Sequence, residues 1–170
     1  MIKSDNISDY KKHTTDPIYK SDNRNTTTNS DTRLENRKLR LAILGAGGIA
    51  RKMAETVNQM EDVELYAVAS RTEEKARQFA DTYHASKWYG SYEEMVADDG
   101  IDLVYVATPH SHHKEHTMLC LNYNRAVLCE KAFAVNTKEA EDMIRLAKEK
   151  NILLAEAMWV RYMPMSFTLK

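Results

Sequence analysis

A glycine-rich turn between an apolar run and a helical pattern constrains this chain more than any other feature of its sequence. The run Leu39–Leu44 is apolar except for Arg40, and residues 45–50 read Gly-Ala-Gly-Gly-Ile-Ala. Helical periodicity then extends from about Gly48 to Met60. A short apolar run indicates a buried strand, and glycine permits a sharp change of backbone direction. We therefore expect a strand, a tight turn and a helix in that order.

The alternation of strand and helix continues along the rest of the chain. Such alternation predicts a parallel sheet covered on both faces, which is an α/β fold of the doubly wound type. The further strands are expected at Val63–Ser70, Lys87–Tyr89, Ile101–Ala107, Ala126–Cys129 and Ile152–Ala155. Further helices are expected from the cap Thr72 to about Tyr83, from Ser91, from Ser111 to about Asn122, and from Thr137 to Lys150.

The composition divides the chain into a polar tail and one folded domain. The chain has 170 residues and is 43% hydrophobic, which is enough for one packed core. Residues 1–37 are so rich in Ser, Thr, Asn, Asp and Lys that they cannot offset the entropy cost of folding. We therefore expect a disordered tail over 1–37 and one folded domain that begins at residue 38.

Charge and cysteine usage exclude several classes of function. A net charge of −1 gives no general attraction to nucleic acid or anionic lipid. No apolar stretch reaches the roughly 20 residues of a membrane span, and the amino terminus lacks the apolar core of a secretory signal. The two cysteines, Cys120 and Cys129, are too few for a disulfide framework, and we expect both to be buried thiols. The sequence therefore predicts a cytoplasmic protein without nucleic-acid or membrane partners.

The glycine turn has the pattern of a site for a dinucleotide. Gly45 permits the turn, Gly47 lets the backbone approach a diphosphate, and Ala50 allows close packing of helix on strand. The amino terminus of the helix then faces the anion. Glycines also serve ordinary turns, but the position after the first strand of an alternating pattern favours the dinucleotide interpretation.

The end of the second strand favours NADP over NAD. An acidic residue there usually binds the ribose hydroxyls of NAD, whereas this strand ends in Ala69-Ser70-Arg71. A guanidinium suits a 2′-phosphate, and the serine adds a hydroxyl donor. The alternative is a solvated arginine on the following turn. The lack of an acid also disfavours a site for S-adenosylmethionine.

Two further strand ends carry polar residues at the carboxyl edge, where open parallel sheets bind ligands. Thr108-Pro109 ends one strand, so Thr108 and His110 are candidates to line a cofactor. Glu130-Lys131 ends the next strand, and a lysine beside a carboxylate can assist proton loss from a substrate hydroxyl. As an isolated pair, these two residues would more often be surface charge.

Four histidines lie close together in sequence at positions 110, 112, 113 and 116. His112 and His116 would share a helix face, but neither a cysteine nor a third ligand converges with them, so we expect no metal site. Further along, Trp159 and Arg161 follow Glu156 in an aromatic segment. Each has an ordinary alternative, because a tryptophan is often core and an arginine is often exposed.

In combination, these motifs resemble the Gfo/Idh/MocA oxidoreductases, over about Leu39 to Pro164. Thr108-Pro109 with His113 matches the TPxxxH segment of that family, and the run from Glu156 through Trp159 to Arg161 is similar to the dimeric dihydrodiol dehydrogenases and NADP-dependent xylose dehydrogenases. The resemblance implies a Rossmann fold, reversible hydride transfer between NADP and a sugar or trans-dihydrodiol carbon bearing a hydroxyl, and Lys131 as the catalytic lysine. It places around the cofactor Gly45, Ala46, Gly47, Gly48, Ile49, Ala50, Ser70, Arg71, Ala107, Thr108, Pro109, His110, His113, Glu130, Lys131, Trp159 and Arg161.

Two departures from the family pattern affect the expected site. The family's Glu-Lys-Pro is Glu130-Lys131-Ala132 here, and a cis bond costs roughly 2.5–4 kcal/mol before a residue other than proline, against about 0.5–1 kcal/mol before proline. Either Lys131 lies on a displaced trans turn or the cis bond is kept at that cost. The second departure is length, because family members continue into an open sheet that supplies the substrate-pocket wall. The resemblance thus implies a dinucleotide-binding domain over 38–158 and the start of the substrate domain over 159–170. We expect the rest of that second domain to be missing and the apolar surface it would cover to be exposed.

Three functions remain open from the sequence. The first is an NADP-dependent oxidoreductase of sugars or diols, represented by its cofactor domain and inactive alone. The second is a binding module that holds NADP without chemistry, as a homo-oligomer or with a complementing carboxyl-terminal fragment. The third is an inactive fragment, with Ala132 as a sign of relaxed constraint.

Overall fold

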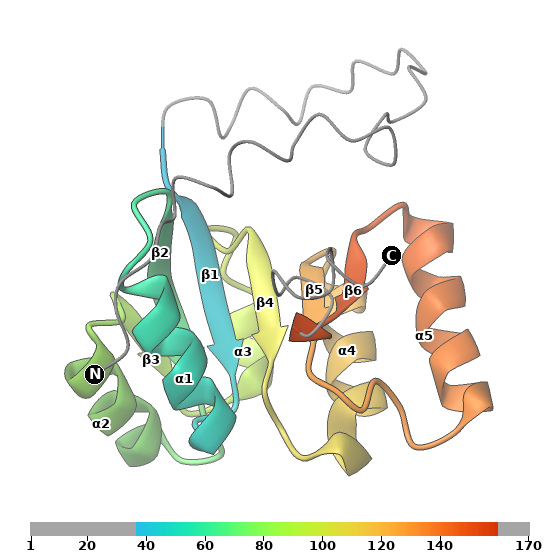
Figure 1. Cartoon of the computed structure of the whole chain (residues 1–170), viewed down its shortest axis with the longest axis horizontal. Helices are drawn as coiled ribbons and strands as arrows, with labels where there is room; N and C mark the ends of the chain where they lie inside the picture. The colour runs from blue at the N-terminus through green and yellow to red at the C-terminus, as the bar shows by residue number, and fades with distance from the viewer. Residues whose placement is uncertain (1–36, 160–170) are drawn as a thin grey trace, which may run out of the picture. The chain divides into compact units, whose positions relative to one another are not determined.

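A computed structural model describes residues 37–159, so the expected tail over 1–37 lies, except for Arg37, outside the described residues. Within them, six parallel strands form one sheet in the order β3-β2-β1-β4-β5-β6, which is the order of the Rossmann fold (Figure 1). The predicted fold class is therefore confirmed. The strands are β1 (Leu39–Leu44), β2 (Val63–Ala69), β3 (Lys87–Tyr89), β4 (Leu103–Val106), β5 (Ala126–Cys129) and β6 (Leu154–Glu156).

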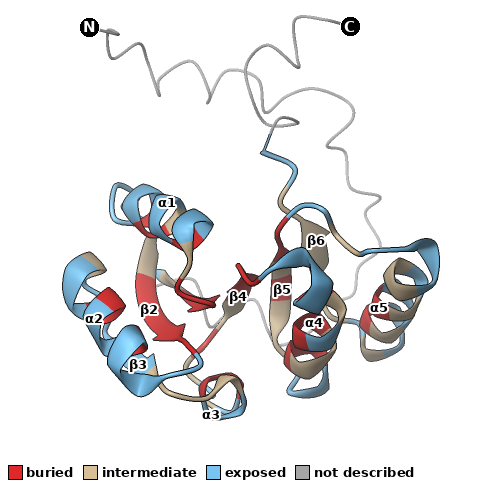
Figure 2. Ribbon diagram, turned by 90° about the horizontal axis from the view of Figure 1, so that it is seen from below, coloured by how far each residue is buried: buried red, intermediate tan, exposed pale blue. Residues whose placement is uncertain are grey.

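Helices cover both faces of the sheet, because side chains of the buried strands alternate between two apolar clusters. One cluster joins Leu41 and Ile43 of β1 to Ala50 and Phe79 of the helices α1 and α2. The other joins the intervening strand residues to α3, α4 and α5, so α1 lies opposite α3 and α4 (Figure 2). The helices are α1 (Gly48–Val57), α2 (Glu73–Tyr83), α3 (Tyr92–Val96), α4 (His113–Asn122) and α5 (Thr137–Lys150), with a 3-10 turn η4 (His110–His112) before α4.

The predicted elements all form, and the differences lie at their ends. The helix α1 stops at Val57, because Asn58 caps it, and β6 begins at Leu154 and includes Glu156, which pairs with Cys129 of β5. Ser111 lies in η4 instead of starting α4, because His112 N donates to Pro109 O at 2.8 Å. Thr72 stands at the cap position of α2, but its side chain makes no capping hydrogen bond, which corrects that expectation.

One residue interrupts the regular pairing of β1 with β2. Leu41 is opposite Leu65, and Ala42 is opposite Ala67, so Tyr66 is an extra residue in β2. Because of this bulge, Tyr66 and Ala67 both pack into the cluster under α3, α4 and α5, where simple alternation would have separated them. Strict alternation of side chains between the two faces of the sheet therefore fails at this position.

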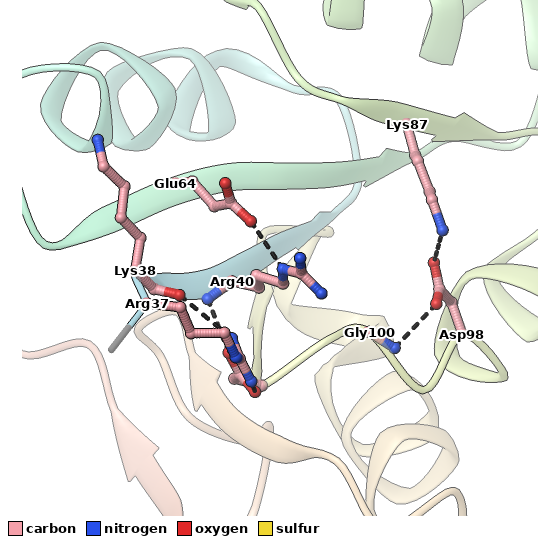
Figure 3. A network of polar contacts seen from close by, with 8 residues as sticks. Arg37, Lys38, Arg40, Glu64, Lys87, Asp98 and Gly100 are labelled. Carbon is pink, nitrogen blue, oxygen red and sulfur yellow. Dashed lines mark hydrogen bonds and ion pairs between the residues drawn. The ribbon is translucent and has the colours of Figure 1, made fainter. Parts of the chain in front are cut away.

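Salt bridges and hydrogen bonds of charged side chains connect neighbouring segments at the amino-terminal edge of the sheet (Figure 3). Arg37 makes two hydrogen bonds to Asp102, at 2.6 and 2.7 Å, and Arg40 Nε lies 2.8 Å from Glu64 Oε1. Lys87 Nζ lies 2.7 Å from Asp98, whose other oxygen accepts from Gly100 N. Salt bridges therefore connect the starts of neighbouring strands at this edge. The glycine turn and the other strand-end motifs lie at the opposite, carboxyl edge, toward which the strand arrows point (Figure 1).

Candidate nucleotide-binding site

Gly45 makes the turn that follows β1. Its φ of 103° is strained for any L side chain, and a Cβ there would lie 2.9 Å from Thr108 Cγ2. Gly45 N donates to Ala69 O at 2.9 Å, which brings the turn against the end of β2. The ends of β1, β2 and β4 therefore meet at this one glycine.

The amino terminus of α1 is open to an anion. Its cap is Gly47, which has no side chain to accept from the first amides, and no acidic residue lies in the first turn. The first backbone N–H groups of a helix lack partners within the helix and carry the positive end of its dipole. A Cβ on Gly48 would meet nothing within 4 Å, so the approach is clear of protein. Ala46 and Ala50 are buried and hold α1 against the sheet.

The residues after β2 present a cation beside this turn. Ser70 is buried and its N donates to Tyr89 O at 3.1 Å, whereas Arg71 is exposed. Burial raises the pKa of Tyr92, and the positive charge of nearby Arg71 opposes part of that rise. Arg71 thus follows the end of β2, the strand that neighbours β1 and its glycine turn.

Two histidines of α4 hold Thr108 at the end of β4. His113 Nε2 lies 2.9 Å from Thr108 O, and His116 Nδ1 lies 2.9 Å from Thr108 Oγ1. Both histidines are buried, and burial lowers the pKa of His116, which favours its neutral ring. Pro109 and His110 are exposed on the next turn. Thr108 is therefore held by both histidines. Its methyl group also lies close to Gly45, where an added Cβ would be 2.9 Å from Thr108 Cγ2.

Glu130 and Lys131 differ sharply in their surroundings. Glu130 is buried, and its carboxylate accepts from the hydroxyl of Tyr105 and from Lys131 N at 3.0 Å. Lys131 is exposed, and its peptide bond to Ala132 is cis. Of the two alternatives left open by the sequence, the chain therefore has the cis turn.

Side chains from two other elements hold the backbone after Lys131. His113 Nδ1 lies 2.7 Å from Ala132 O, and Phe133 N donates to Glu156 Oε1 at 3.1 Å. Carbonyl oxygens only accept, so each ring nitrogen of His113 faces an acceptor, one on Thr108 and one on Ala132. His113 thus joins the turn after β4 to the turn after β5.

The structure brings together most of the residues that the sequence analysis selected. The ends of β1, β2, β4 and β5 meet at the carboxyl edge, where Ile49 is 38% exposed beside the glycine turn and Ala107 is buried behind it. Trp159 is 60% exposed, so it is not core within the described residues, and Arg161 lies outside them. Their contacts with a cofactor stay predictions.

Sequence reasoning missed Tyr105 and the role of Glu156. Tyr105 looked like an ordinary strand residue, and its contact with Glu130 joins positions 25 apart in the chain. Glu156 was selected only as the start of the run to Arg161, whereas its carboxylate accepts from Phe133 N. A polar hydroxyl inside an otherwise apolar strand was the one available signal. His112 and His116 do share a face, with ring centroids 5.6 Å apart, and residues 37–159 contain no cluster of three metal-ligating side chains.

This strand order, with a glycine turn at the carboxyl edge of the sheet, defines a Rossmann domain of the dinucleotide-binding type. A family model described as an oxidoreductase family with an NAD-binding Rossmann fold, Gfo/Idh/MocA, matches residues 39–158. The chain belongs to the Gfo/Idh/MocA family and contains its NAD(P)-binding domain. The family resemblance predicted from the motifs is confirmed.

Similar proteins include two dehydrogenases named for NADP. The chain is 42% identical to a D-xylose 1-dehydrogenase (NADP+) of Hypocrea jecorina over 78% of this chain and 37% of that protein. It is 42% identical to a scyllo-inositol 2-dehydrogenase (NADP+) of Bacillus subtilis, over 74% of this chain and 38% of that protein. A trans-1,2-dihydrobenzene-1,2-diol dehydrogenase of Mus musculus is 38% identical over 74% of this chain and 38% of its own length. The chain thus spans less than half the length of these relatives.

Solved structures agree on the fold. A 3-ketoreductase from Actinomadura kijaniata, in complex with NADP and TDP-benzene, superposes with a TM-score of 0.75 at 25% identity, over 78% of this chain and 41% of that one. No helix among residues 37–159 combines the length and apolar character needed to cross a membrane.

Proposed function

We propose that this chain binds NADP and is the cofactor domain of an oxidoreductase that transfers a hydride to or from a hydroxyl-bearing carbon of a sugar or trans-dihydrodiol. The observation that carries the proposal is the open, glycine-capped terminus of α1 beside Ser70 and the exposed Arg71. The helix amides would take the diphosphate, and the guanidinium would take the 2′-phosphate. The names of the similar xylose and inositol dehydrogenases support the choice of NADP.

The chemistry would take place at the end of β5. Bound NADP supplies the hydride chemistry, and the protein supplies alignment and electrostatics. The exposed ammonium of Lys131 would donate a hydrogen bond to the substrate oxygen and assist movement of its proton. Thr108 and Pro109 would form the wall beside the cofactor, with Thr108 held by His113 and His116.

The NADP assignment is tested by Arg71→Ala, with Arg77→Ala as a matched control. Arg77 is another exposed arginine, on α2, and is paired only loosely with Asp81 at 3.9 Å. Loss of a guanidinium–phosphate pair should weaken NADPH binding by roughly 10- to 100-fold in Arg71→Ala, because that pair is charge-assisted. Binding of NADH, which lacks the phosphate, should stay within about twofold. Fluorescence titration of the unaltered chain and of both variants measures the affinities for NADPH and NADH. Equal weakening of both nucleotides in Arg71→Ala would contradict the assignment.

The second candidate is a module that binds NADP without chemistry. It is supported by the open, glycine-capped terminus of α1 and the exposed Arg71, which could hold a nucleotide without any reaction. Turnover of NADPH or NADP+ with D-xylose, scyllo-inositol and a trans-dihydrodiol distinguishes the two candidates. Binding without turnover supports the module, and turnover that survives in Lys131→Met would remove the lysine from the mechanism.

A further inference from the structure

The backbone around Lys131 is held by three side chains, one that follows β5, one from α4 and one from β6. Lys131 N donates to Glu130, Ala132 O accepts from His113 of α4, and Phe133 N donates to Glu156 of β6. A lysine that must aim its ammonium at one atom needs a fixed backbone, because its own four-carbon side chain is flexible. These three hydrogen bonds therefore fix the backbone from which the exposed Lys131 side chain extends.

Among these three side chains, Glu130 depends most on a single hydrogen-bond partner. Its carboxylate is buried, and the contact that ties it to the core is the hydroxyl of Tyr105, which is only 1% exposed in β4. Burial, followed by the hydrogen bond to Glu130, raises the pKa of Tyr105, so the hydroxyl keeps its proton and remains a donor. A buried carboxylate without donors is costly. The Tyr105 hydroxyl is thus what keeps the Glu130 carboxylate turned inward.

We propose that Tyr105 is a positioning residue for Lys131, acting through Glu130. One carboxylate oxygen accepts from Tyr105 and the other accepts from Lys131 N, so the orientation set in the core is passed to the lysine turn. Without the hydroxyl, the carboxylate turns toward water and releases the Lys131 amide. The inference rests on the proposed function, in that Lys131 is taken to face the nicotinamide end of NADP.

The two halves of the cofactor should respond differently to loss of the hydroxyl. The adenosine phosphate end would be held by α1, Ser70 and Arg71, none of which Tyr105 touches through its oxygen. The ring of Tyr105 packs with Ala46 and Ala50 under the glycine turn, and Tyr105→Phe keeps that ring. A ligand that reaches Lys131 should therefore lose affinity, and a ligand that ends at the adenosine phosphates should not.

The test compares NADP+ with 2′,5′-ADP, which has the adenosine phosphates but no nicotinamide. In Tyr105→Phe, NADP+ should bind about tenfold more weakly, the size of one lost hydrogen bond to a charged group. The affinity for 2′,5′-ADP should stay within about twofold, and its titration counts the folded sites in the same sample. The matched control is Tyr66→Phe, a second buried tyrosine, which lies in β2 beside Gly100. It should leave both affinities unchanged.

Glu130→Gln provides an independent second variant. The amide oxygen still accepts from Tyr105, but the amide nitrogen cannot accept from Lys131 N, so the same selective loss of NADP+ affinity is expected. An unchanged ratio of the two affinities in both variants overturns the inference, as does equal weakening of both ligands, which would indicate general loss of structure. If the unaltered chain bound neither ligand, the proposed function itself would fall, and this outcome is separate from the other two.

Discussion

Gly45 and Gly48 lie three positions apart and face opposite constraints. Gly45 has a positive φ, and a Cβ there would press on Thr108 and on the backbone of Ala107. Gly48 has room on every side for a Cβ and lies in the first turn of α1. The same amino acid is therefore required for the fold at one position and dispensable for it at the other.

We expect Gly45→Ala to lower the free energy of unfolding by about 2–4 kcal/mol, from the left-handed backbone and the close contact with Thr108. Gly48→Ala should leave it unchanged or raise it by up to about 1 kcal/mol, because alanine is the better helix former. Urea denaturation followed by circular dichroism measures both changes. Equal destabilisation by the two substitutions would contradict the backbone geometry of the turn.

At the level of elements, the connection from α3 to β4 is held by Asp98. Its carboxylate accepts from Lys87 Nζ and from the hydroxyl of Tyr89, each at 2.7 Å, and from Gly100 N at 2.9 Å. Burial alone would raise the pKa of Asp98, but these three donors together hold it well below its usual range. Burial and the bond to Asp98 raise the pKa of Tyr89 to about 12. The carboxylate thus ties β3 to the loop that leads into β4.

The stability that Asp98 contributes should depend on pH in one direction. An aspartate titrates near pH 4 in an unfolded chain, and the pKa of Asp98 is lower than this in the folded protein. Its contribution is therefore complete above about pH 5 and is lost as the pH falls through the folded pKa. Asp98→Asn should lower the melting temperature by about 5 °C at pH 7 and by less at pH 3.

The control for this prediction is Asp81→Asn, because the carboxylate of Asp81 is 67% exposed and lies 3.9 Å from Arg77. Exposed ion pairs of this kind contribute roughly 0–1 kcal/mol, so its melting curve should follow that of the unaltered chain at both pH values. Thermal melts monitored by circular dichroism at pH 7 and pH 3 provide the comparison. A constant difference for Asp98→Asn between the two pH values would refute the linkage.

At the level of the whole described domain, the sheet has an apolar margin at β6. That strand pairs with β5, and no further strand among residues 37–159 pairs with its other side. Leu153 and Ile144 are 63% and 41% exposed there, beside a hollow of about 350 Å³ between α5 and β6. Exposed strand edges with apolar neighbours promote association between chains.

We expect the chain to self-associate through this margin, and Leu153→Glu to oppose it. Removal of one buried leucine contact should raise the concentration at half-association about tenfold. Met60→Glu is the matched control, because Met60 is also exposed, at 43%, but follows α1 away from β6. Sedimentation velocity over a range of concentrations measures the effect. An equal shift in both variants would mean that added charge, and not this surface, is responsible.

Local patterns in the sequence were sufficient to predict the fold. Six strands, the helices between them, the glycine turn and the positions of Ser70, Arg71, Thr108 and Lys131 at strand ends all follow from periodicity and turn chemistry, which act over a few residues. Parallel pairing then places the carboxyl ends of the strands at one edge. The candidate site was therefore predictable as a set of strand ends.

Contacts between residues distant in the chain were decided only by tertiary packing. The hydroxyl of Tyr105 on Glu130, the two bonds of His113 and the bond of Glu156 to Phe133 depend on register between strands and on how α4 lies over the sheet. The bulge at Tyr66 likewise arises from the pairing of β1 with β2. Periodicity predicts on which face of a strand or helix a side chain lies, because that is a local property. A hydrogen bond between two elements depends instead on how the elements are placed relative to each other, which no local pattern encodes.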